Sequence, residues 1–504
     1  MSQLNPYVFW PPFLIIMGAA LGSFLYPDIF LAGTTQLNDW LLHHFGWLFS
    51  LAALSFLGIV IWTYASPLGK LKIGGQEAKP ILTKWRWFAI TLCTTVAVGI
   101  LFWGTAEPIS HLHAPPKGLG LEPGSGEAAT FALSTMFMHW TFIPYGIYTL
   151  ASLMFAIGYY NLKQPFSLGT MLFPILGEKV HGNWGKVIDA ICLFSLVAGM
   201  AASLGAGLLT IAGGLESVFG LTSGPGMLAL IGLCIVVSFI LSAASGLQKG
   251  IRILSDLNLR AFLLMTAFVF ITGPTIFLLS FGVEGMGEFL QTFFQRALYT
   301  GAAADDPWAK SWTIFYWANW LAWTPVTALF LGRLSYGYTV REVIRFNLIY
   351  PALFSCVWML VFSGTALHMD LNGADYPLQQ VVNELGYENV IFAVFERLPL
   401  AGITSTLFLL VAFLSYVTAA DSNTSAMSGL SSTGISPESP EPTLWIKIAW
   451  GAAVGIIAWV MVTFASIDGI KMASNIGGLP ALFLLIAIAW GMVRLILNPE
   501  RLNL

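Results

Sequence analysis

Long stretches without a charged residue alternate with short polar connections along the whole chain. A helix needs about 20 residues to cross the hydrocarbon core of a membrane, and each stretch is close to that length or longer. Since lipid offers no hydrogen bonds to an exposed backbone, helices rather than open strands are predicted for these stretches. The twelve predicted spans are 7–26, 46–64, 87–106, 128–160, 190–215, 227–247, 261–283, 311–332, 346–369, 398–420, 448–467 and 472–492.

The composition agrees with a chain that is embedded in a lipid bilayer. Of its 504 residues, 57% are hydrophobic and 9% are charged, whereas about a quarter of the residues in soluble domains are charged. An all-α integral membrane protein is therefore expected, with membrane lipid as a constant partner. The net charge of −3 and the lack of a basic stripe give no reason to expect a nucleic-acid partner.

Basic residues are divided unevenly between the connections. Five of the 22 lie in odd-numbered connections, and the other seventeen lie in even-numbered connections or in the C-terminal tail. Connections rich in Lys and Arg stay in the cytoplasm, so both termini are predicted to be cytoplasmic. The five on the outer side are Lys117, Arg296, Lys310, Arg397 and Lys471.

The third and eighth spans resemble each other. Both have a Trp-rich centre and reach a proline, in "FWGTAEP" (102–108) and "FYWANWLAWTP" (315–325). With the amino terminus inside, these spans run in opposite directions, as expected if helices 3–7 and 8–12 form two inverted five-helix repeats after two extra helices. Glycine and proline are also common in membrane helices generally, and a six-plus-six division fits the count as well. The pattern alone leaves both divisions open.

The predicted organisation follows the five-plus-five division. Its parts are 1–86 (two helices and a cytoplasmic loop), 87–283 (first repeat), 284–310 (a loop with an amphipathic helix on the outer surface) and 311–504 (second repeat). The spacing of Phe289, Phe293 and Leu298 suggests the loop helix.

Catalytic chemistry is not indicated. The chain has no HExxH, GxSxG or GxxxxGK[ST] motif, so an enzyme is not expected and no cofactor is implied. His111 and His113 could bind a metal, but a third ligand is missing nearby in sequence, which favours a solvated pair. His139, within a span, is a buried polar residue or a proton relay. Glu107, before a proline at the outer end of the third span, is an outer-gate residue or an interfacial one.

Aromatic residues inside the spans are the main candidate chemistry. Trp140, Trp320 and Trp323 lie too far from the span ends for an interfacial belt, and an indole N–H facing lipid would lack a partner. Tyr316, Trp320 and Trp323 share one helical stripe, at i, i+4 and i+7. Such rings suit a quaternary ammonium group, which cannot donate hydrogen bonds and is held by π faces at about 0.5–2 kcal/mol per ring.

Several motifs resemble those of one transporter family. "SWTIFYWANW" (311–320) is similar to the signature G-W-T-x-F-Y-W-x-W-W of the betaine/carnitine/choline transporter family. The resemblance extends along most of the chain and implies a twelve-helix protein with a five-plus-five inverted repeat. It also implies a homotrimer in the bacterial inner membrane that imports an onium compound. The further matches are "FWGTAEP" (102–108), "MHW" (138–140), "SLGAG" (203–207), "GLQKGIRILSD" (246–256), "GRLSYGYTVRE" (332–342) and "TAADSNTSAMS" (418–428).

The resemblance assigns the aromatic residues to a substrate site. Trp320 and Trp323 match positions that enclose the trimethylammonium group, and Trp140 and Tyr148 match aromatics that line the same pathway. Trp312 and Tyr316 are nearby candidates.

Asn319 departs from the family signature, since it stands where the signature has the first tryptophan of its Trp-Trp pair. An amide that donates and accepts hydrogen bonds replaces one π wall. The departure admits a substrate with an extra polar group or a smaller onium head.

The resemblance also bears on the coupling ion. Asn258 and Thr327 stand where sodium-independent exchangers of the family carry an arginine and a methionine, so no built-in positive charge replaces an ion here. Sodium is the expected coupling ion, bound by Thr418 and by backbone carbonyls near Ala97 and Gly99. Proton-coupled choline-type symport, sodium-independent exchange and a channel-like protein are the alternatives.

Overall fold

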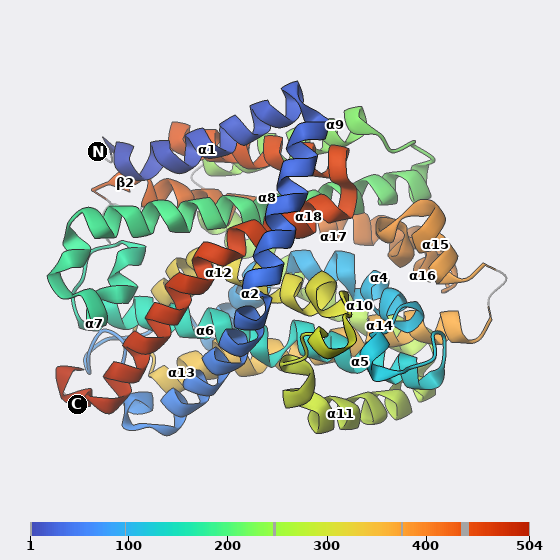
Figure 1. The fold of residues 1–504 in the computed structure, drawn as a ribbon, viewed down its shortest axis with the longest axis horizontal. Coiled ribbons are helices and arrows are strands. Elements are labelled where there is room, and N and C mark those ends of the chain that lie inside the picture. The colour runs from blue at the N-terminus through green and yellow to red at the C-terminus, as the bar shows by residue number, and fades with distance from the viewer. Residues whose placement is uncertain (1–2, 96, 245–247, 374–375, 435–442, 503–504) are drawn as a thin grey trace.

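The chain folds into a bundle of helices (Figure 1). The computed structural model describes residues 3–95, 97–244, 248–373, 376–434 and 443–502. The helices of the first half are α1 (Pro6–Leu25), α2 (Pro27–Ala65), α3 (Lys84–Thr95), α4 (Ala97–His113), α5 (Gly126–Trp140), α6 (Phe142–Ala156), α7 (Phe173–Leu176), α8 (Asn183–Phe219) and α9 (Pro225–Ala244). Those of the second half are α10 (Gln248–Thr272), α11 (Thr275–Ala297), α12 (Phe315–Leu334), α13 (Val340–Ile344), α14 (Tyr350–Leu371), α15 (Leu378–Leu385), α16 (Val390–Glu396), α17 (Ala401–Leu430) and α18 (Leu444–Leu497).

Strand structure is confined, within the described residues, to one pair of two-residue strands. β1 (Gln3–Leu4) pairs antiparallel with β2 (Ser432–Thr433), with Gln3 opposite Thr433. Three π turns, at Ile157–Asn161, Lys310–Ile314 and Arg345–Ile349, and several short 3₁₀ turns complete the pattern. The expected all-α architecture is therefore observed.

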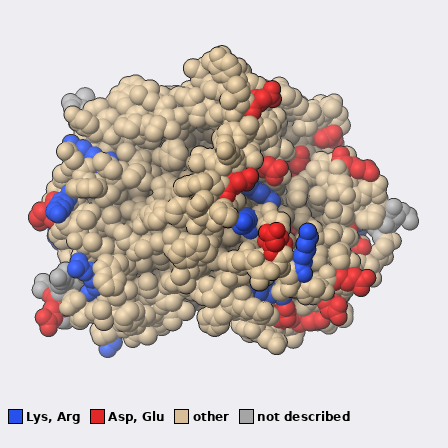
Figure 2. Space-filling view, viewed as in Figure 1, with Lys and Arg blue, Asp and Glu red and all other residues tan. Residues whose placement is uncertain are grey.

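Apolar helices long enough to cross a membrane recur along the described chain. Seven meet that standard, and the bent pair α10 and α11 would be an eighth. Figure 2 shows charged side chains at the left edge and over the right half of this face, with a broad uncharged band between the two groups. Both features are those of a multi-pass membrane protein.

Helix α18 consists of two helical segments that follow each other without a loop. At about 1.5 Å per residue its 54 residues would extend far beyond a hydrocarbon core of about 30 Å. The helix is broken at Ser466, whose φ of 46° and ψ of −129° lie outside the helical region. The two predicted spans 448–467 and 472–492 are thus divided by a kink rather than a loop, and the kink lies at Ser466, inside the predicted end of the first span. In Figure 1, α18 crosses the front of the molecule, where it packs against α2.

The predicted span 261–283 is wrong in its second half. The axes of residues 256–272 and 275–297 differ by 107°, and the chain turns at Gly273 and Pro274. Proline lacks an N–H and disfavours the helical conformation of the residue before it, so an uninterrupted apolar stretch does not stay one helix. The amphipathic helix predicted within 284–310 is α11, which starts at Thr275, so the proposed boundary at 283/284 falls inside it.

The predicted span 128–160 is also interrupted, at Thr141. This residue separates α5 from α6, with φ −123° and ψ −113°. Pro144 has no N–H to give to the Trp140 carbonyl, which removes one bond that would join the two helices. Residues 126–161 still form one apolar span long enough to cross a membrane, so the predicted span is confirmed with a local break next to His139 and Trp140.

The centre of the bundle is built from five helices, α6, α8, α12, α17 and α18. α8 packs against α17 and α18, while α12 packs against α6, α8 and α18. Trp317 and Trp320 of α12 and Tyr145 of α6 are among the largest fully buried side chains. The aromatic stretch that stands out in the sequence therefore lies in the core rather than against lipid.

Candidate functional site

Five of the residues predicted to bind substrate line one cavity. Its volume is about 40 Å³, room for a few water molecules. Its walls come from α3, α4, α5, α6, α8, α12 and α18, and none of the lining residues is charged. The lining residues are Thr95, Gly99, Trp103, Trp140, Tyr148, Ala202, Ser203, Ala206, Phe315, Asn319, Trp320, Trp323 and Ile470. We call this the ring cavity.

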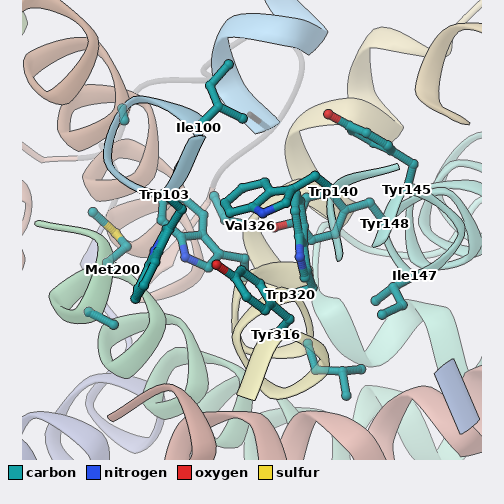
Figure 3. Packing of buried hydrophobic residues seen from close by; sticks show 14 of the residues in the cluster. Ile100, Trp103, Trp140, Tyr145, Ile147, Tyr148, Met200, Tyr316, Trp320 and Val326 are labelled. Atoms are coloured by element: carbon teal, nitrogen blue, oxygen red, sulfur yellow. The ribbon is translucent and has the colours of Figure 1, made fainter. Parts of the chain in front are cut away.

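Trp320 is the centre of the aromatic wall (Figure 3). Its ring centroid lies 5.6 Å from that of Trp140, 5.8 Å from that of Tyr145 and 5.1 Å from that of Tyr148. The contacts with Trp140 and Tyr148 are edge-to-face, a favoured geometry for aromatic pairs. Rings that fix one another in this way form a rigid wall.

The indole N–H groups of the wall are used within the protein. Trp320 donates its N–H to the backbone carbonyl of His139 at 3.1 Å, and Trp140 donates to Glu107 Oε2 at 2.8 Å. The His139 carbonyl is close to the break between α5 and α6 described above. Because these donors already have acceptors, the rings can offer their π faces to a ligand.

Glu107 is the acceptor that joins the two sides of this wall. Its Oε1 lies 3.1 Å from His111 Nε2 and 2.6 Å from His139 Nδ1. Its Oε2 accepts from Trp140 Nε1 and from the Tyr316 hydroxyl, which is 2.5 Å away. Four hydrogen-bond donors therefore converge on one carboxyl group. Glu107 is fully buried.

The two histidines of "HLH" separate in the structure. His111 joins Glu107 and His139, and ligand atoms of these three residues lie within 4.8 Å of one another. His113 instead contacts Asp370 Oδ2 at 2.5 Å. Glu107, His111 and His139 are residue types found in zinc sites. Here, however, Glu107 already contacts both histidines and accepts from Trp140 and Tyr316, so metal binding would have to rearrange these contacts.

Tyr316 and Trp312 lie behind the ring cavity rather than in its lining. Tyr316 is held by Glu107, and its ring stacks on that of His139 at 4.5 Å. Trp312 belongs to the π turn Lys310–Ile314, with its ring 4.7 Å from that of His111. The Lys471 ammonium lies 3.9 Å above the Trp312 ring. Both aromatic residues therefore support the wall from behind.

Asn319 lines the ring cavity and also contacts α18. The Ser474 hydroxyl lies 3.1 Å from Asn319 Oδ1 and 2.9 Å from the Ile470 carbonyl, and it can donate to either. The amide is half-buried. It places a hydrogen-bonding group in a wall that is otherwise mostly aromatic and apolar.

The residues expected around sodium are distributed over four helices. Ala97 and Gly99 belong to α4, Thr418 to α17, Asn258 to α10 and Thr327 to α12. Helix α17 packs against α4, α10 and α12. The Thr418 hydroxyl donates to the Leu414 carbonyl, and that of Thr327 donates to the Thr324 carbonyl. The Asn258 carboxamide is buried, and neither of its polar atoms has a partner among the described residues.

Gly99 has a packing role as well. A Cβ atom at this position would lie 2.5 Å from the Trp140 ring. Gly99→Ala is therefore expected to displace Trp140, to lower the free energy of unfolding by about 1–3 kcal/mol and to weaken ligand binding in the ring cavity. Thermal unfolding and ligand-dependent tryptophan fluorescence of the purified protein would measure both effects.

Gly58→Ala on α2 is the matched control for this prediction, because a Cβ there has no atom within 4 Å. Equal stability and binding in Gly99→Ala and Gly58→Ala would contradict the packing role.

Comparison with known proteins now bears on the same residues. The family model for betaine/carnitine/choline transporters matches residues 7–500. The chain belongs to this family. The resemblance suggested by "SWTIFYWANW" is thus confirmed, and the protein is a transporter rather than an enzyme.

Relatives within the betaine/carnitine/choline family carry different substrates. The chain is 31% identical to the Bacillus subtilis glycine betaine transporter OpuD over 478 residues, 94% of this chain and 91% of the relative. It is 30% identical to the Acinetobacter baylyi osmo-independent choline transporter BetT1 over 500 residues, 98% and 93% of the two chains. It is also 30% identical to the Virgibacillus pantothenticus ectoine/hydroxyectoine transporter over 497 residues, 99% and 97%. Overall identity therefore does not distinguish between these substrates.

Some residues of the site in this family member are not evident from sequence spacing. Phe315 and Trp103 line the ring cavity although neither lies on the stripe of Tyr316, Trp320 and Trp323. The distribution of basic residues predicts Lys471 in an outer connection, whereas the structure places it within α18, with its ammonium group over the Trp312 ring. The available signal was a single basic residue in a long apolar segment, where an ionisable group is functional by default.

Proposed function

We propose that this transporter imports a quaternary ammonium or related onium compound by sodium symport and alternating access. The observation that carries the proposal is the ring cavity, which has aromatic walls and no Asp or Glu in its lining. An onium group is recognised by π faces rather than by hydrogen bonds, at about 0.5–2 kcal/mol per ring. The relatives named as betaine and choline transporters support the same substrate class.

Binding an onium group would require the walls to move apart. A cavity of about 40 Å³ is too small for a trimethylammonium group, whose four carbon and nitrogen atoms are closely packed. The π turns and helix breaks next to the ring-bearing helices offer places where such movement can occur. Alternating access would then expose the cavity to each side in turn.

Side-chain oxygen atoms whose lone pairs accept no hydrogen bond from the described residues support the proposal of sodium coupling. Asn258 has a buried amide oxygen without a partner among the described residues. The Thr418 oxygen donates its only proton to a carbonyl and keeps its lone pairs. Hard cations take oxygen ligands of this kind. We therefore propose that sodium is co-transported through these residues together with carbonyls near Ala97 and Gly99.

A sodium gradient imposed on proteoliposomes tests the coupling. Radiolabelled glycine betaine, choline or ectoine is expected to accumulate when sodium is high outside, and to stay at equilibrium when potassium replaces sodium. Thr418→Val, which keeps the side-chain shape but removes the hydroxyl, is expected to raise the sodium concentration needed for half-maximal uptake. Uptake that ignores the sodium gradient would contradict the proposal.

Proton-coupled choline-type symport is the second candidate. The observation in its favour is the buried group of Glu107, His111 and His139 next to the ring cavity. Accumulation driven by an imposed pH gradient without sodium would support it. Sodium-independent exchange would show as uptake that requires substrate inside the vesicles, and a channel would show as flux that does not saturate.

We also propose the twelve-helix, five-plus-five arrangement. In each proposed repeat, short helical segments connect the second long helix to the third. Residues 168–181 connect α6 to α8, and residues 378–396 connect α14 to α17. An inverted repeat would place these two connections on opposite sides of the membrane.

Orientation and assembly are part of the same proposal. The start of α1 and the end of α18 lie at the same end of the molecule in Figure 1, which supports a topology with both termini in the cytoplasm. The distribution of basic residues supports that assignment. We expect a homotrimer in the bacterial inner membrane, as the family resemblance implies.

A further inference from the structure

Lys471 is a cation placed beside the aromatic wall. It lies on α18 five residues after the break at Ser466 and directly after Ile470, which lines the ring cavity. Its ammonium group lies 3.9 Å from the centroid of the Trp312 ring and 5.8 Å from that of Phe315. Phe315 also lines the ring cavity, so the ammonium group lies close to one of the cavity's rings.

The Lys471 ammonium has no direct ionic partner in the described part of the chain. No carboxylate oxygen there lies within 4.0 Å of it. Asp468 and Glu107 act on it electrostatically over longer distances. Asp468 is exposed to solvent, and the oxygens of Glu107 are occupied by four donors.

A π contact alone is an unusual environment for a half-buried ammonium group. A buried charge is costly unless an opposite charge or several acceptors compensate for it. Lys471 keeps three donors, and none of them has a hydrogen-bond acceptor within the described residues. The environment would therefore be completed by a ligand that brings a negative group.

The charge of Lys471 also bears on substrate choice. A ligand with only a positive charge would gain binding free energy from the rings but would be repelled by the ammonium group. A ligand with an onium group and a carboxylate a few bonds away could place the first against the rings and the second against Lys471. In such a site, a fixed ammonium selects for the zwitterion.

We propose that Lys471 binds the carboxylate of a zwitterionic onium substrate whose cationic end occupies the ring cavity. The inference rests on the proposed function and narrows it: the substrate class is betaine-like rather than choline-like. Lys471 contributes specificity, while the rings contribute recognition of the onium group common to both classes.

Glycine betaine and choline are the matched probes. Both carry a trimethylammonium group, and they differ in having a carboxylate or a hydroxyl at the other end. Binding would be measured by tryptophan fluorescence of purified protein with saturating sodium. The wild-type protein is expected to bind glycine betaine at least about tenfold more tightly than choline, a difference of about 1.4 kcal/mol.

Replacement of Lys471 separates charge from packing. Lys471→Met is expected to weaken glycine betaine binding at least about tenfold and to leave choline binding unchanged or tighter. Lys471→Arg keeps the positive charge and is expected to preserve the preference for glycine betaine. Lys117→Met removes a charge from an exposed residue of the connection after α4 and should leave both affinities unchanged.

Three outcomes would overturn the inference. The first is a wild-type preference for choline, which needs no variant and so does not depend on the folding of any mutant. The second is a parallel loss of both ligands in Lys471→Met, which would mean that Lys471 only packs on Trp312. The third is that neither probe binds to the wild-type protein. This result would contradict the proposed function as well, whereas the first two outcomes would contradict only the role of Lys471.

Discussion

Trp320→Ala is expected to abolish saturable onium uptake at micromolar substrate. Trp320 contacts the rings of Trp140, Tyr145 and Tyr148, so its removal deletes one π face and also releases the rings beside it. Loss of one desolvated cation–π contact costs about 2 kcal/mol, or roughly thirtyfold in affinity. Deleting a buried tryptophan also lowers the free energy of unfolding by about 3–5 kcal/mol.

Trp320→Phe is the matched control for this prediction. Phenylalanine keeps a π face and loses the N–H that donates to the His139 carbonyl. It should therefore retain saturable uptake with a modestly raised KM. Uptake in proteoliposomes and thermal unfolding of the same preparations separate a binding defect from a folding defect. Wild-type kinetics in Trp320→Ala would rule out the ring cavity as the substrate site.

The second large effect is expected at Glu107. In Glu107→Ala, four buried donors lose their acceptor, from His111, His139, Trp140 and Tyr316. Each buried donor left without a partner costs about 1–3 kcal/mol. We expect a large fall in the midpoint of thermal unfolding and a loss of onium binding, because Trp140 is no longer fixed at the edge of the ring cavity.

Glu107→Gln tests how the carboxyl group acts. The carbonyl oxygen of a glutamine can accept hydrogen bonds from Trp140 and Tyr316. Its NH₂ group can donate to the two histidines, whose ring nitrogens can accept after a change of tautomer. This variant should therefore recover part of the stability and of the onium affinity that Glu107→Ala loses. If glutamine and alanine had equal effects on both quantities, the acceptor role of Glu107 would be refuted.

The gathering of the aromatic residues could be predicted from sequence, but the shape of the site could not. Trp320 and Trp323 share a helical stripe, and the stripe alone places them on one side of α12. The same stripe includes Tyr316, which is instead held behind the cavity because Glu107 accepts its hydroxyl. Trp312 precedes α12 in a π turn, whose period differs from 3.6 residues, so the spacing could not place its ring.

For the fold, too, features set by the local sequence could be predicted, whereas features set by distant contacts could not. Hydropathy located the apolar stretches, since it depends on each stretch alone. It placed one helix across Gly273 and Pro274, where the structure turns by 107°. It also gave no sign that His139 joins Glu107 and His111, which already lie one turn apart on α4, because the packing of α4 against α5 brings His139 to them. Bends and long-range contacts of this kind are not encoded in local hydrophobicity.

The break at Ser466 has a mechanical consequence. Within eight residues after it, α18 supplies Ile470 to the lining of the ring cavity, Lys471 to Trp312 and Ser474 to Asn319. These three residues lie on one helical segment and cannot move independently. A rotation of the segment after Ser466 would therefore break all three contacts in a single step. Ser466 would then act as a hinge, and residues 470–474 would move toward or away from the site as one rigid body.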